Sequence, residues 1–465
     1  MDMSTKTLFR PVVEKRKQHR SYKTLCSSAG SLPARWMLDD VYATFEDPDG
    51  NFLEQFQSTG FDTRYFELYL HAYFSRSGYH IERPKPNPDF IVERGGFRVA
   101  VEATTVNPAK AGAIAAEGKA ISDLDEAGLN EYMRNELAIR LGSPLFSKLK
   151  KRYWESEACK DLPLVIAIEA FHDDESLMFS DAALARYVFG VDQLTGNWDA
   201  TGTLIISASD VTEHKVGSKT IPSSFFAQLD ADNISAILFT NSGTNAKFGR
   251  MGYQHGAGNE TISVWRSGFA YEPDPDAMDP TYFAYDMDTP PFVESWGQGL
   301  VVLHNPRAVR PIPLGFFVDA TESRIENGMI TTQFAGWHPI ASKTAFAAMG
   351  KAKAKLAKLP YRMSPVDVYA ISKHDFDRII GVFEDDSFTA SGWFCDGSRS
   401  FYGIVMNKVD DGDWGYFLFA RDFNGQFHLI SSKKVGRSRH QARMTLQVVI
   451  AKFLASPKRY FERQS

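Results

Sequence analysis

Apolar residues recur at helical spacing between positions 62 and 81, in the stretch "DTRYFELYLHAYFSRSGYHI". The stripe consists of Phe66, Tyr69, Leu70 and Tyr73, and it predicts a helix packed against a core. Asp62 or Thr63 is the expected helix cap. Strand-like runs come next, at "YHIERP" (79–84), "DFIVE" (89–93) and "FRVAVEATT" (97–105). The "RGG" between the last two predicts a tight turn, which would pair these strands antiparallel.

A second helical region follows a stretch rich in Ala, Gly and acidic residues. Residues 107–129 are expected to form a loop or flap, and a helix is expected over 130–141. A new helix is predicted over 142–155, with Ser143 as its cap and Pro144 in its first turn. The run "LPLVIAIEAF" (162–171) is continuously apolar, which is typical of a strand buried on both faces.

This order of helix, three strands, helix and strand predicts an α/β core over residues 51–175, preceded by an arm and short helix (1–50). The runs "GTLIIS" (202–207) and "ISAILFT" (234–240) predict that an extended mixed sheet continues into region 176–360. The rest of that region is rich in Pro, Gly and aromatic residues. We expect it to be an irregular, β-rich cover that ends in a basic linker helix, 346–360.

The pattern changes again near residue 361. One helix (372–380), four strand candidates and a long final helix predict a separate small α+β domain over 361–465. The strand candidates are "TASGWFC" (389–395), "FYGIVMN" (401–407), "WGYFLFARD" (414–422) and "FHLISSKK" (427–434).

Composition narrows the class of protein. A chain of 465 residues with 43% hydrophobic and 23% charged residues should be largely folded. The net charge of −5 argues against a globally basic nucleic-acid coat, although it allows a local basic groove. The three cysteines are far apart, which argues against a zinc knuckle or a disulfide framework. No secretory pattern or membrane-length apolar run is visible, so we expect a cytoplasmic protein without a membrane partner.

Candidate chemistry lies on the strand at 97–104. Its alternation places Glu102 and Thr104 on one face, and an antiparallel neighbour would bring Asp89 opposite them. Two converging carboxylates suit Mg²⁺, which keeps several waters. Glu67, at the edge of the apolar stripe of the first helix, is a third candidate ligand. Each acid also has a structural interpretation: a turn residue for Asp89, a pair with Arg98 for Glu102, and a favourable helix-dipole position for Glu67.

Glu67, Pro88-Asp89 and Glu102-Ala-Thr104 together resemble the active-site signature of the PD-(D/E)XK nuclease superfamily. The resemblance covers about a quarter of the chain. It implies a restriction-endonuclease-like α-β-β-β-α-β core, with Asp89 and Glu102 as metal ligands and Glu67 matching an acid that many members carry on the first core helix. The chain departs from the pattern at Thr104, where the family has Lys.

In some members the basic residue comes instead from the following core helix. This chain has candidates there, in "SKLKKRYW" (147–154). Leu145, Leu149 and Tyr153 define the predicted buried stripe of that helix. Lys148 and Arg152 lie at its edge, with Lys151 slightly further round, and a long lysine side chain can cross apolar surface to reach a site. A solvated basic face is the alternative interpretation.

The resemblance implies a Mg²⁺-dependent nuclease, in which Mn²⁺ could substitute. Such an enzyme would hydrolyse phosphodiester bonds, of DNA rather than RNA by analogy, and a defence or restriction-like role would fit. Lys148 or Lys151 would stabilise the charge-rich transition state. The alternatives are a catalytically silent member of the fold that binds nucleic acid or a protein, and a metal-free structural protein.

Two basic segments add candidate nucleic-acid contacts. "VEKRKQHRSYK" (13–23) reads either as a solvated arm or as a nucleic-acid contact. "KKVGRSRHQAR" (433–443) reads either as a solvated helix start or as a phosphate-contacting segment. Basic groups at a predicted helix start oppose the helix dipole, which favours the second interpretation. The candidates there are Lys433, Lys434, Arg437, Arg439 and Arg443, and Arg152 of the helix predicted over 142–155 is a further candidate contact. A homodimer or a protein partner through the C-terminal domain is left open.

Overall fold

The computed structural model describes most of the chain up to residue 348 and parts of the remainder. The described residues are 6–107, 124–171, 180–198, 204–258, 261–272, 280–288, 290, 293–348, 368–371, 388–396, 401–408, 412–421, 427–436, 442, 445, 446 and 449. They divide into two compact units, one made of residues 1–259 and 293–342, the other of residues 260–292 and 343–465.

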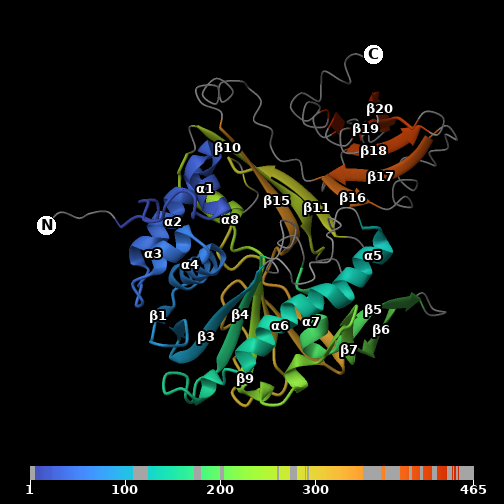
Figure 1. The fold of residues 1–465 in the computed structure, drawn as a ribbon. Helices are drawn as coiled ribbons and strands as arrows, with labels where there is room; N and C mark the ends of the chain where they lie inside the picture. Colours follow the sequence, from blue (N-terminus) through green and yellow to red (C-terminus); the bar gives the residue numbers. More distant parts are fainter. Residues whose placement is uncertain are drawn as a thin grey trace. The chain divides into compact units, whose positions relative to one another are not determined.

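The first unit is built on an eight-stranded mixed sheet with the order β1-β2-β3-β4-β9-β12-β13-β14 (Figure 1). β3, β4 and β9 run parallel, as do β12 and β13, while the other neighbouring pairs are antiparallel. The strands are β1 (His80–Glu82), β2 (Phe90–Arg94), β3 (Phe97–Val106), β4 (Leu164–Ala170), β9 (Ile234–Thr240), β12 (Leu300–His304), β13 (Thr321–Glu326) and β14 (Met329–Gln333).

The helices of this unit cover both faces of the sheet. They are α1 (Arg20–Ser27), α2 (Leu32–Thr44), α3 (Phe52–Gln57), α4 (Phe61–Arg76), α5 (Glu126–Glu131), α6 (Leu137–Leu149), α7 (Ala182–Phe189) and α8 (Asn245–Gln254). Short helical turns occur at Ala29–Ser31, Tyr132–Glu136 (a π-helix), Tyr153–Glu155, Phe225–Ala227 and Ala231–Asn233. Two hairpins, β5 (Val191–Trp198) with β6 (Leu204–Asp210) and β7 (Glu213–Val216) with β8 (Lys219–Pro222), form separate two-stranded sheets.

Each face of the sheet carries its own apolar core. Val99, Val101 and Ala103 of β3 pack with α1–α4 and α8, whereas Ala100 and Val106 pack with α6 and α7. Every residue of β4 and β9 is buried, as expected for strands covered on both sides. The continuous apolar runs predicted at 162–171 and 234–240 are therefore confirmed as central strands.

The predicted tight turn is confirmed and it sets the register of the site. Gly95 and Gly96 both have positive φ angles, of 61° and 79°, which glycine adopts without a steric penalty. The β2–β3 hairpin that they close pairs Phe90 with Val101. In an antiparallel pair, one residue back along β2 lies opposite one residue forward along β3. Asp89 therefore lies opposite Glu102.

The helical predictions need three corrections. α4 follows Gly60 rather than an Asp62 or Thr63 cap, and the predicted new helix over 142–155 does not start at Ser143. α6 instead runs through Pro144, and the Ser143 hydroxyl donates back to the Ile139 carbonyl. α6 ends at Leu149, short of the predicted residue 155, and Arg152 beyond it adopts a left-handed conformation with a φ angle of 49°.

The sheet predictions also change in two places. The run at 202–207 contributes to β6, which pairs with β5 in a separate hairpin and does not extend the large sheet. The first residues of the predicted linker helix at 346–360 belong instead to strand β15 (Pro339–Ala348). The flap at 107–129 and the rest of that linker lie largely outside the described residues.

The described part of the second unit contains a three-stranded and a five-stranded sheet. β10 (Ile262–Ala270) and β11 (Thr281–Asp286) form a three-stranded sheet with β15. A five-stranded meander follows, made of β16 (Val368–Ile371), β17 (Phe388–Asp396), β18 (Phe401–Lys408), β19 (Trp414–Arg421) and β20 (Phe427–Gly436). The four predicted C-terminal strands are thus confirmed, and β16 adds a fifth. The helix predicted at 372–380 lies outside the described residues, as does most of the final one.

The fold is therefore mixed α/β with a large mixed sheet, as predicted at that level. Residues 260–292 fall in the second unit, although the sequence placed them in one region with residues 176–360. Within the described residues, no helix is both long enough and apolar enough to cross a membrane.

Candidate active site

Two carboxylates meet at the start of β2 and in the second half of β3. The Asp89 N–H donates to Glu102 Oε2 (3.3 Å), and Asp89 Oδ2 accepts the Ala103 N–H (2.8 Å). Glu102 is buried, with 6% of its surface exposed, whereas Asp89 is only partly buried. The hairpin thus holds both acids from the backbone, and Asp89 Oδ1 has no hydrogen-bond partner within the described part of the chain.

The electrostatics of Asp89 are those of a crowded acidic site. Burial, followed by the neighbouring Glu102 and Glu67 carboxylates, raises the pKa of Asp89 to about 7. Lys148 and the Ala103 N–H oppose this shift. A nearby cation would stabilise the ionised form of such a carboxyl group and so lower its pKa.

A lysine reaches the acids from the helix that follows β3. Lys148, in the last turn of α6, places Nζ 2.6 Å from Glu102 Oε1. Its side chain is 16% exposed and crosses the apolar α6 face of the sheet. The structure therefore brings Lys148 together with Asp89 and Glu102, in the arrangement that the sequence suggested for a relocated lysine.

Tyr153 lies beside this ion pair. Burial, together with the neighbouring Glu102 carboxylate, raises the pKa of Tyr153. Lys148 and Lys151 each place Nζ 5.7 Å from the centre of the Tyr153 ring. Lys151 is exposed and lies beyond the end of α6, so it sits beside the ring and not on the carboxylates.

Glu67 has a different environment from that of a free metal ligand. Its carboxylate is 2% exposed and accepts from Arg64 through Oε1 (2.6 Å) and from Arg83 through Oε2 (2.7 Å). Arg83 also donates to the main-chain carbonyl of Asp89 (3.3 Å). Both oxygens of Glu67 are engaged by guanidinium groups, so this geometry departs from the predicted metal ligation and connects Glu67 to Asp89 through Arg83.

The other predicted site residues lie around or away from this centre. Thr104 is partly buried on the α6 face, beside Ile168 of β4. Arg152 turns to Glu155 (3.0 Å) and Asp230 (3.9 Å) instead of to the acids. Lys433 and Lys434 lie on β20, not in a helix, and Lys434 pairs with Asp413 (2.7 Å). Arg437, Arg439 and Arg443 lie outside the described residues.

The carboxylate oxygens of the site suit a hard divalent cation that takes few of its ligands from the protein. Asp89 offers its Oδ1, unpaired among the described residues, whereas the two oxygens of Glu102 already accept from Lys148 (2.6 Å) and from the Asp89 N–H (3.3 Å), so a cation would compete with these contacts at Glu102. Mg²⁺ commonly takes one or two carboxylates and keeps its remaining ligands as water. Among the residues that the structure describes, no group of three or more His, Cys, Asp and Glu side chains is placed to hold a metal. A Mg²⁺ ion at this position could take Asp89 and Glu102 as protein ligands.

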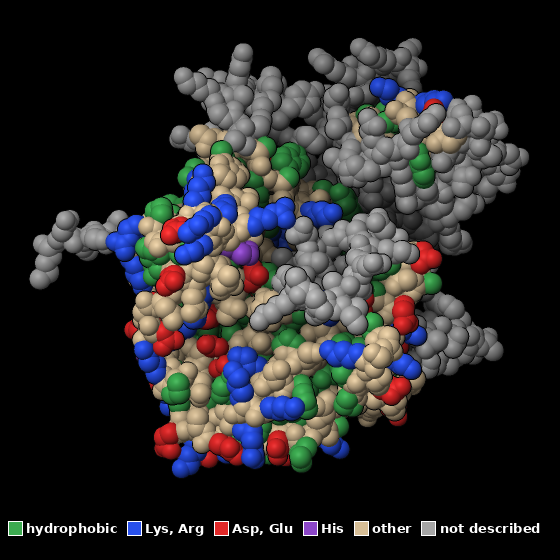
Figure 2. Space-filling view, in the orientation of Figure 1, with side chains coloured by type: hydrophobic (Ala, Val, Ile, Leu, Met, Phe, Trp, Pro, Cys, Tyr) green, Lys and Arg blue, Asp and Glu red, His purple; other side chains and the backbone are tan. Residues whose placement is uncertain are grey.

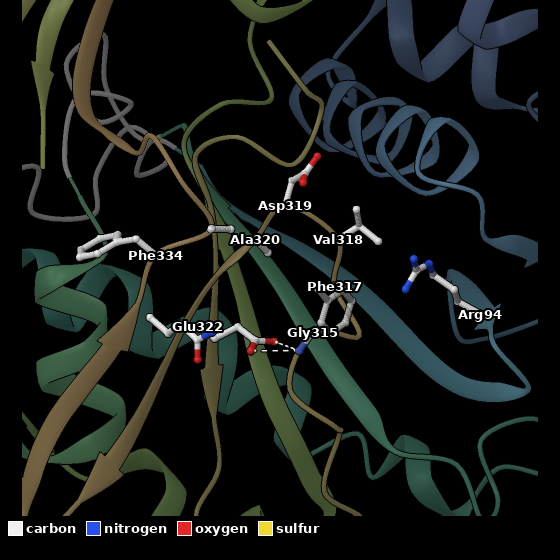
Figure 3. Close-up of a pocket in the computed structure, with 10 residues that line it drawn as sticks. Arg94, Gly315, Phe317, Val318, Asp319, Ala320, Glu322 and Phe334 are labelled. Carbon is white, nitrogen blue, oxygen red and sulfur yellow. Dashed lines mark hydrogen bonds between the residues drawn. The ribbon is translucent and has the colours of Figure 1, made fainter. Parts of the chain in front are cut away.

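A separate cavity of about 270 Å³ lies elsewhere in the first unit (Figure 3). It is lined by Arg94, Gly315, Phe317, Val318, Asp319, Ala320, Glu322, Gln333, Phe334 and Ala335. Arg94 is at the opposite end of β2 from Asp89. The Glu322 carboxylate accepts the Gly315 N–H through both oxygens (3.0 and 3.1 Å), so it holds the loop that lines the cavity.

Arg64 and Arg83 contact the site but were not predicted from the sequence. Arg64 precedes Glu67 by three residues on the same helix, a spacing that signals an ion pair. Arg83 lies in the connection after β1 and gave no comparable signal. No known family model matches the chain, and no curated protein or solved structure matches it.

Proposed function

We propose that the first unit is a Mg²⁺-dependent phosphodiesterase of the PD-(D/E)XK type, acting on nucleic acid, with DNA favoured over RNA by analogy. The observation that carries the proposal is the 2.6 Å contact between Lys148 Nζ and Glu102, directly beside Asp89. The element order α4-β1-β2-β3-α6-β4 also supports a restriction-endonuclease-like core. Lys148 would then supply the charge that Thr104 lacks.

Asp89 and Glu102 would hold the metal ion. When bound, Mg²⁺ would supply Lewis acidity at the phosphoryl oxygen and lower the pKa of a coordinated water. Lys148 has three N–H donors. It would keep a weaker contact with Glu102 and donate a second N–H to a non-bridging phosphoryl oxygen, as negative charge develops on that oxygen. Such a donor acts most strongly in a site that excludes water, and Lys148 is largely buried.

Glu67 and Arg83 would act as positioning residues. The Glu67 carboxylate fixes Arg83, whose guanidinium lies against the rings of Phe45 and Phe90, at 4.1 and 4.9 Å from their centres. Arg83 in turn donates to the Asp89 carbonyl. This arrangement would hold the backbone at Asp89 while its side chain remains available to a cation.

The test is cleavage of plasmid and linear duplex DNA with Mg²⁺ or Mn²⁺, together with Mn²⁺ binding by calorimetry. Asp89→Asn and Glu102→Gln keep the shape of each side chain and should abolish both activities while the fold is retained. Full cleavage by either variant would end the assignment to these residues. A wild-type protein that binds duplex DNA but neither cleaves it nor binds Mn²⁺ would establish the catalytically silent alternative.

A further inference from the structure

The segment from Arg10 to Lys23, here called the basic strap, concentrates positive charge in an acidic protein. It contains a single acid, Glu14, in a chain with a net charge of −5. Its six cations are Arg10, Lys15, Arg16, Lys17, Arg20 and Lys23. The sequence alone is compatible with a solvated arm or with a nucleic-acid contact.

The strap is fastened to the core instead of being free in solvent. Gln57, which is 0% exposed, donates to the carbonyls of Leu8 (3.0 Å) and Arg10 (2.7 Å) and accepts the N–H groups of Val12 (2.9 Å) and Val13 (3.3 Å). These four bonds use the full capacity of one amide side chain. The ordering of the strap is therefore already achieved in the folded protein.

Five of the six cations of the strap are exposed, and Lys23 is half-buried. Arg16 is 80% exposed, and Glu14 pairs with Arg16 (2.7 Å) and Lys17 (4.0 Å). In the described part of the chain, the side chains of Arg10, Lys15 and Arg20 are exposed and have no carboxylate partner. Figure 2 shows Lys and Arg side chains gathered over the region of α1 and α2. Exposed cations on a fixed backbone are suited to a polyanion, because little conformational entropy is lost on binding.

The strap approaches the same end of the sheet as the candidate active site. His19 stacks on Phe61 at the start of α4, with ring centres 4.9 Å apart. Two residues along that helix, the Thr63 hydroxyl is hydrogen-bonded to Thr105 (3.2 Å), near the end of β3. Glu102 and Thr104 lie on the same strand but face α6, whereas Thr105 faces α4. A nucleic acid placed at Asp89 and Glu102 would therefore reach the strap by passing around this end of the sheet.

We propose that the basic strap binds phosphates of the nucleic-acid substrate outside the cleavage centre. This inference rests on the proposed function, which supplies the substrate. Each phosphate contact releases condensed counterions, so the logarithm of the binding constant falls with the logarithm of salt concentration by roughly 0.9 per contact on duplex DNA. The three unpaired, exposed cations should therefore account for a slope of about 2 to 3.

The experiment compares the triple variant R10Q/K15Q/R20Q with wild type, using a labelled 30-base-pair duplex in EDTA and a KCl titration. We expect the triple variant to bind about tenfold or more weakly near 0.1 M KCl, with a salt slope smaller by about 2 to 3. A control variant, K160Q/K215Q/R307Q, removes three exposed cations from other parts of the same unit and should bind like wild type. Circular dichroism and the midpoint of thermal unfolding check the folding of both variants.

A second readout separates the strap from the cleavage centre. Hydrolysis of bis(p-nitrophenyl) phosphate with Mn²⁺ needs no phosphates beyond the reacting one, so the triple variant should match wild type. Equal DNA affinities and slopes for the triple variant and wild type would overturn the proposal, as would equal losses in the triple and control variants. A wild type that binds DNA through the strap but hydrolyses neither substrate would refute the proposed function and leave the strap as a binding surface.

Discussion

Two acidic centres lie on opposite faces of the neighbouring strands β3 and β4. Glu102 of β3 faces α6, opposite Asp89 and 2.6 Å from Lys148. Glu169 of β4 lies on the α4 face and is 0% exposed. Its Oε1 accepts the Gly243 N–H (2.7 Å), and its Oε2 has no partner within the described residues. A Cβ atom at Gly243 would lie 2.1 Å from that oxygen, so the second centre is closely packed.

The two centres differ in whether a cation compensates the acid. Lys148 lies 2.6 Å from Glu102, its positive charge opposes the upward pKa shift of Asp89, and Asp89 remains partly accessible. Burial instead raises the pKa of Glu169 well above its usual range, and the single N–H of Gly243 opposes this only in part. A buried acid at a strand end is therefore a candidate for chemistry only where a nearby cation balances its charge and a ligand can reach its carboxylate.

The largest expected effect is on the cleavage rate, when the positive charge of Lys148 on the α6 face is removed. Lys148→Ala should reduce single-turnover DNA cleavage at saturating Mg²⁺ by about 10²–10³-fold, because one charged donor leaves a water-poor site. Lys150→Ala is the matched control, since Lys150 is exposed on the neighbouring turn and contacts the Phe146 ring. Normal cleavage by Lys148→Ala would remove this lysine from the mechanism, and the same loss in Lys150→Ala would point to a general effect of charge.

A third buried acid sharpens the comparison, because Glu67 is compensated by two arginines. Glu67→Gln should destabilise the fold by about 1.5–3 kcal/mol, the range for hydrogen bonds to charged groups, since Arg64 and Arg83 both lose their anionic partner. Urea unfolding at pH 7 measures this. A positioning role predicts a further effect: the variant should cleave more slowly than wild type under conditions where both are fully folded.

Mn²⁺ binding distinguishes this role from metal ligation by Glu67. The Glu67→Gln variant should bind Mn²⁺ with nearly the affinity of the wild type, if Asp89 and Glu102 are the ligands. A large loss of affinity in a folded Glu67→Gln protein would restore Glu67 as a ligand and would contradict the positioning role.

The sequence predicted the α6 centre better than its surroundings for a clear physical reason. Alternation along β3 and the Gly95-Gly96 turn fix the register of a single hairpin, so local rules place Asp89 opposite Glu102. Lys148 follows from helical periodicity over one turn. The contact between Glu67 and Arg83 depends on where the connection after β1 passes over α4, and no local pattern specifies that path.

Two other elements that differ from their sequence-based predictions also depend on contacts with residues distant in sequence. Ser143-Pro144 is a typical helix start, yet α6 continues through it, and Gly142 packs so closely that a Cβ there would lie 2.6 Å from the Tyr187 ring. The run at 202–207 has the composition of a buried strand, but it pairs with β5 in a hairpin. In both cases packing partners distant in sequence decided the outcome over local propensity.

Glu169, the buried acid without a neighbouring cation among the described residues, should make the stability of the fold depend on pH. The folded-state pKa of Glu169 is raised, so its contribution is least unfavourable at low pH, where Glu169 is protonated in both folded and unfolded chains. As pH rises above about 4.3, the unfolded chain ionises first and stability falls by up to about 1.4 kcal/mol per pH unit, until the folded-state pKa is reached. Glu169→Gln stays neutral and should lose this dependence.

Urea unfolding at pH 5, 6, 7 and 8 tests this, as the difference between wild type and Glu169→Gln. The variant should gain stability relative to wild type as pH rises, and it should retain DNA cleavage, since Glu169 lies on the other face from Asp89 and Glu102. A difference that does not change with pH would mean that Glu169 is ionised in the folded protein. It would then have a cationic partner, and the contrast between the two centres would fail.

The smallest expected effect concerns Thr104, which occupies the position where the resembled family has lysine. If Lys148 supplies the charge, Thr104→Val removes at most one hydrogen bond, about 1 kcal/mol or fivefold in rate. Thr105→Val is the matched control: its hydroxyl points to the α4 face and bonds Thr63, so it should affect stability and not cleavage. Single-turnover cleavage by Thr104→Val, Thr105→Val and Lys148→Ala ranks the three side chains. If Thr104→Val is the slowest and Lys148→Ala cleaves normally, the charge has not moved to α6, and the ion pair between Lys148 and Glu102 serves only to compensate a buried acid.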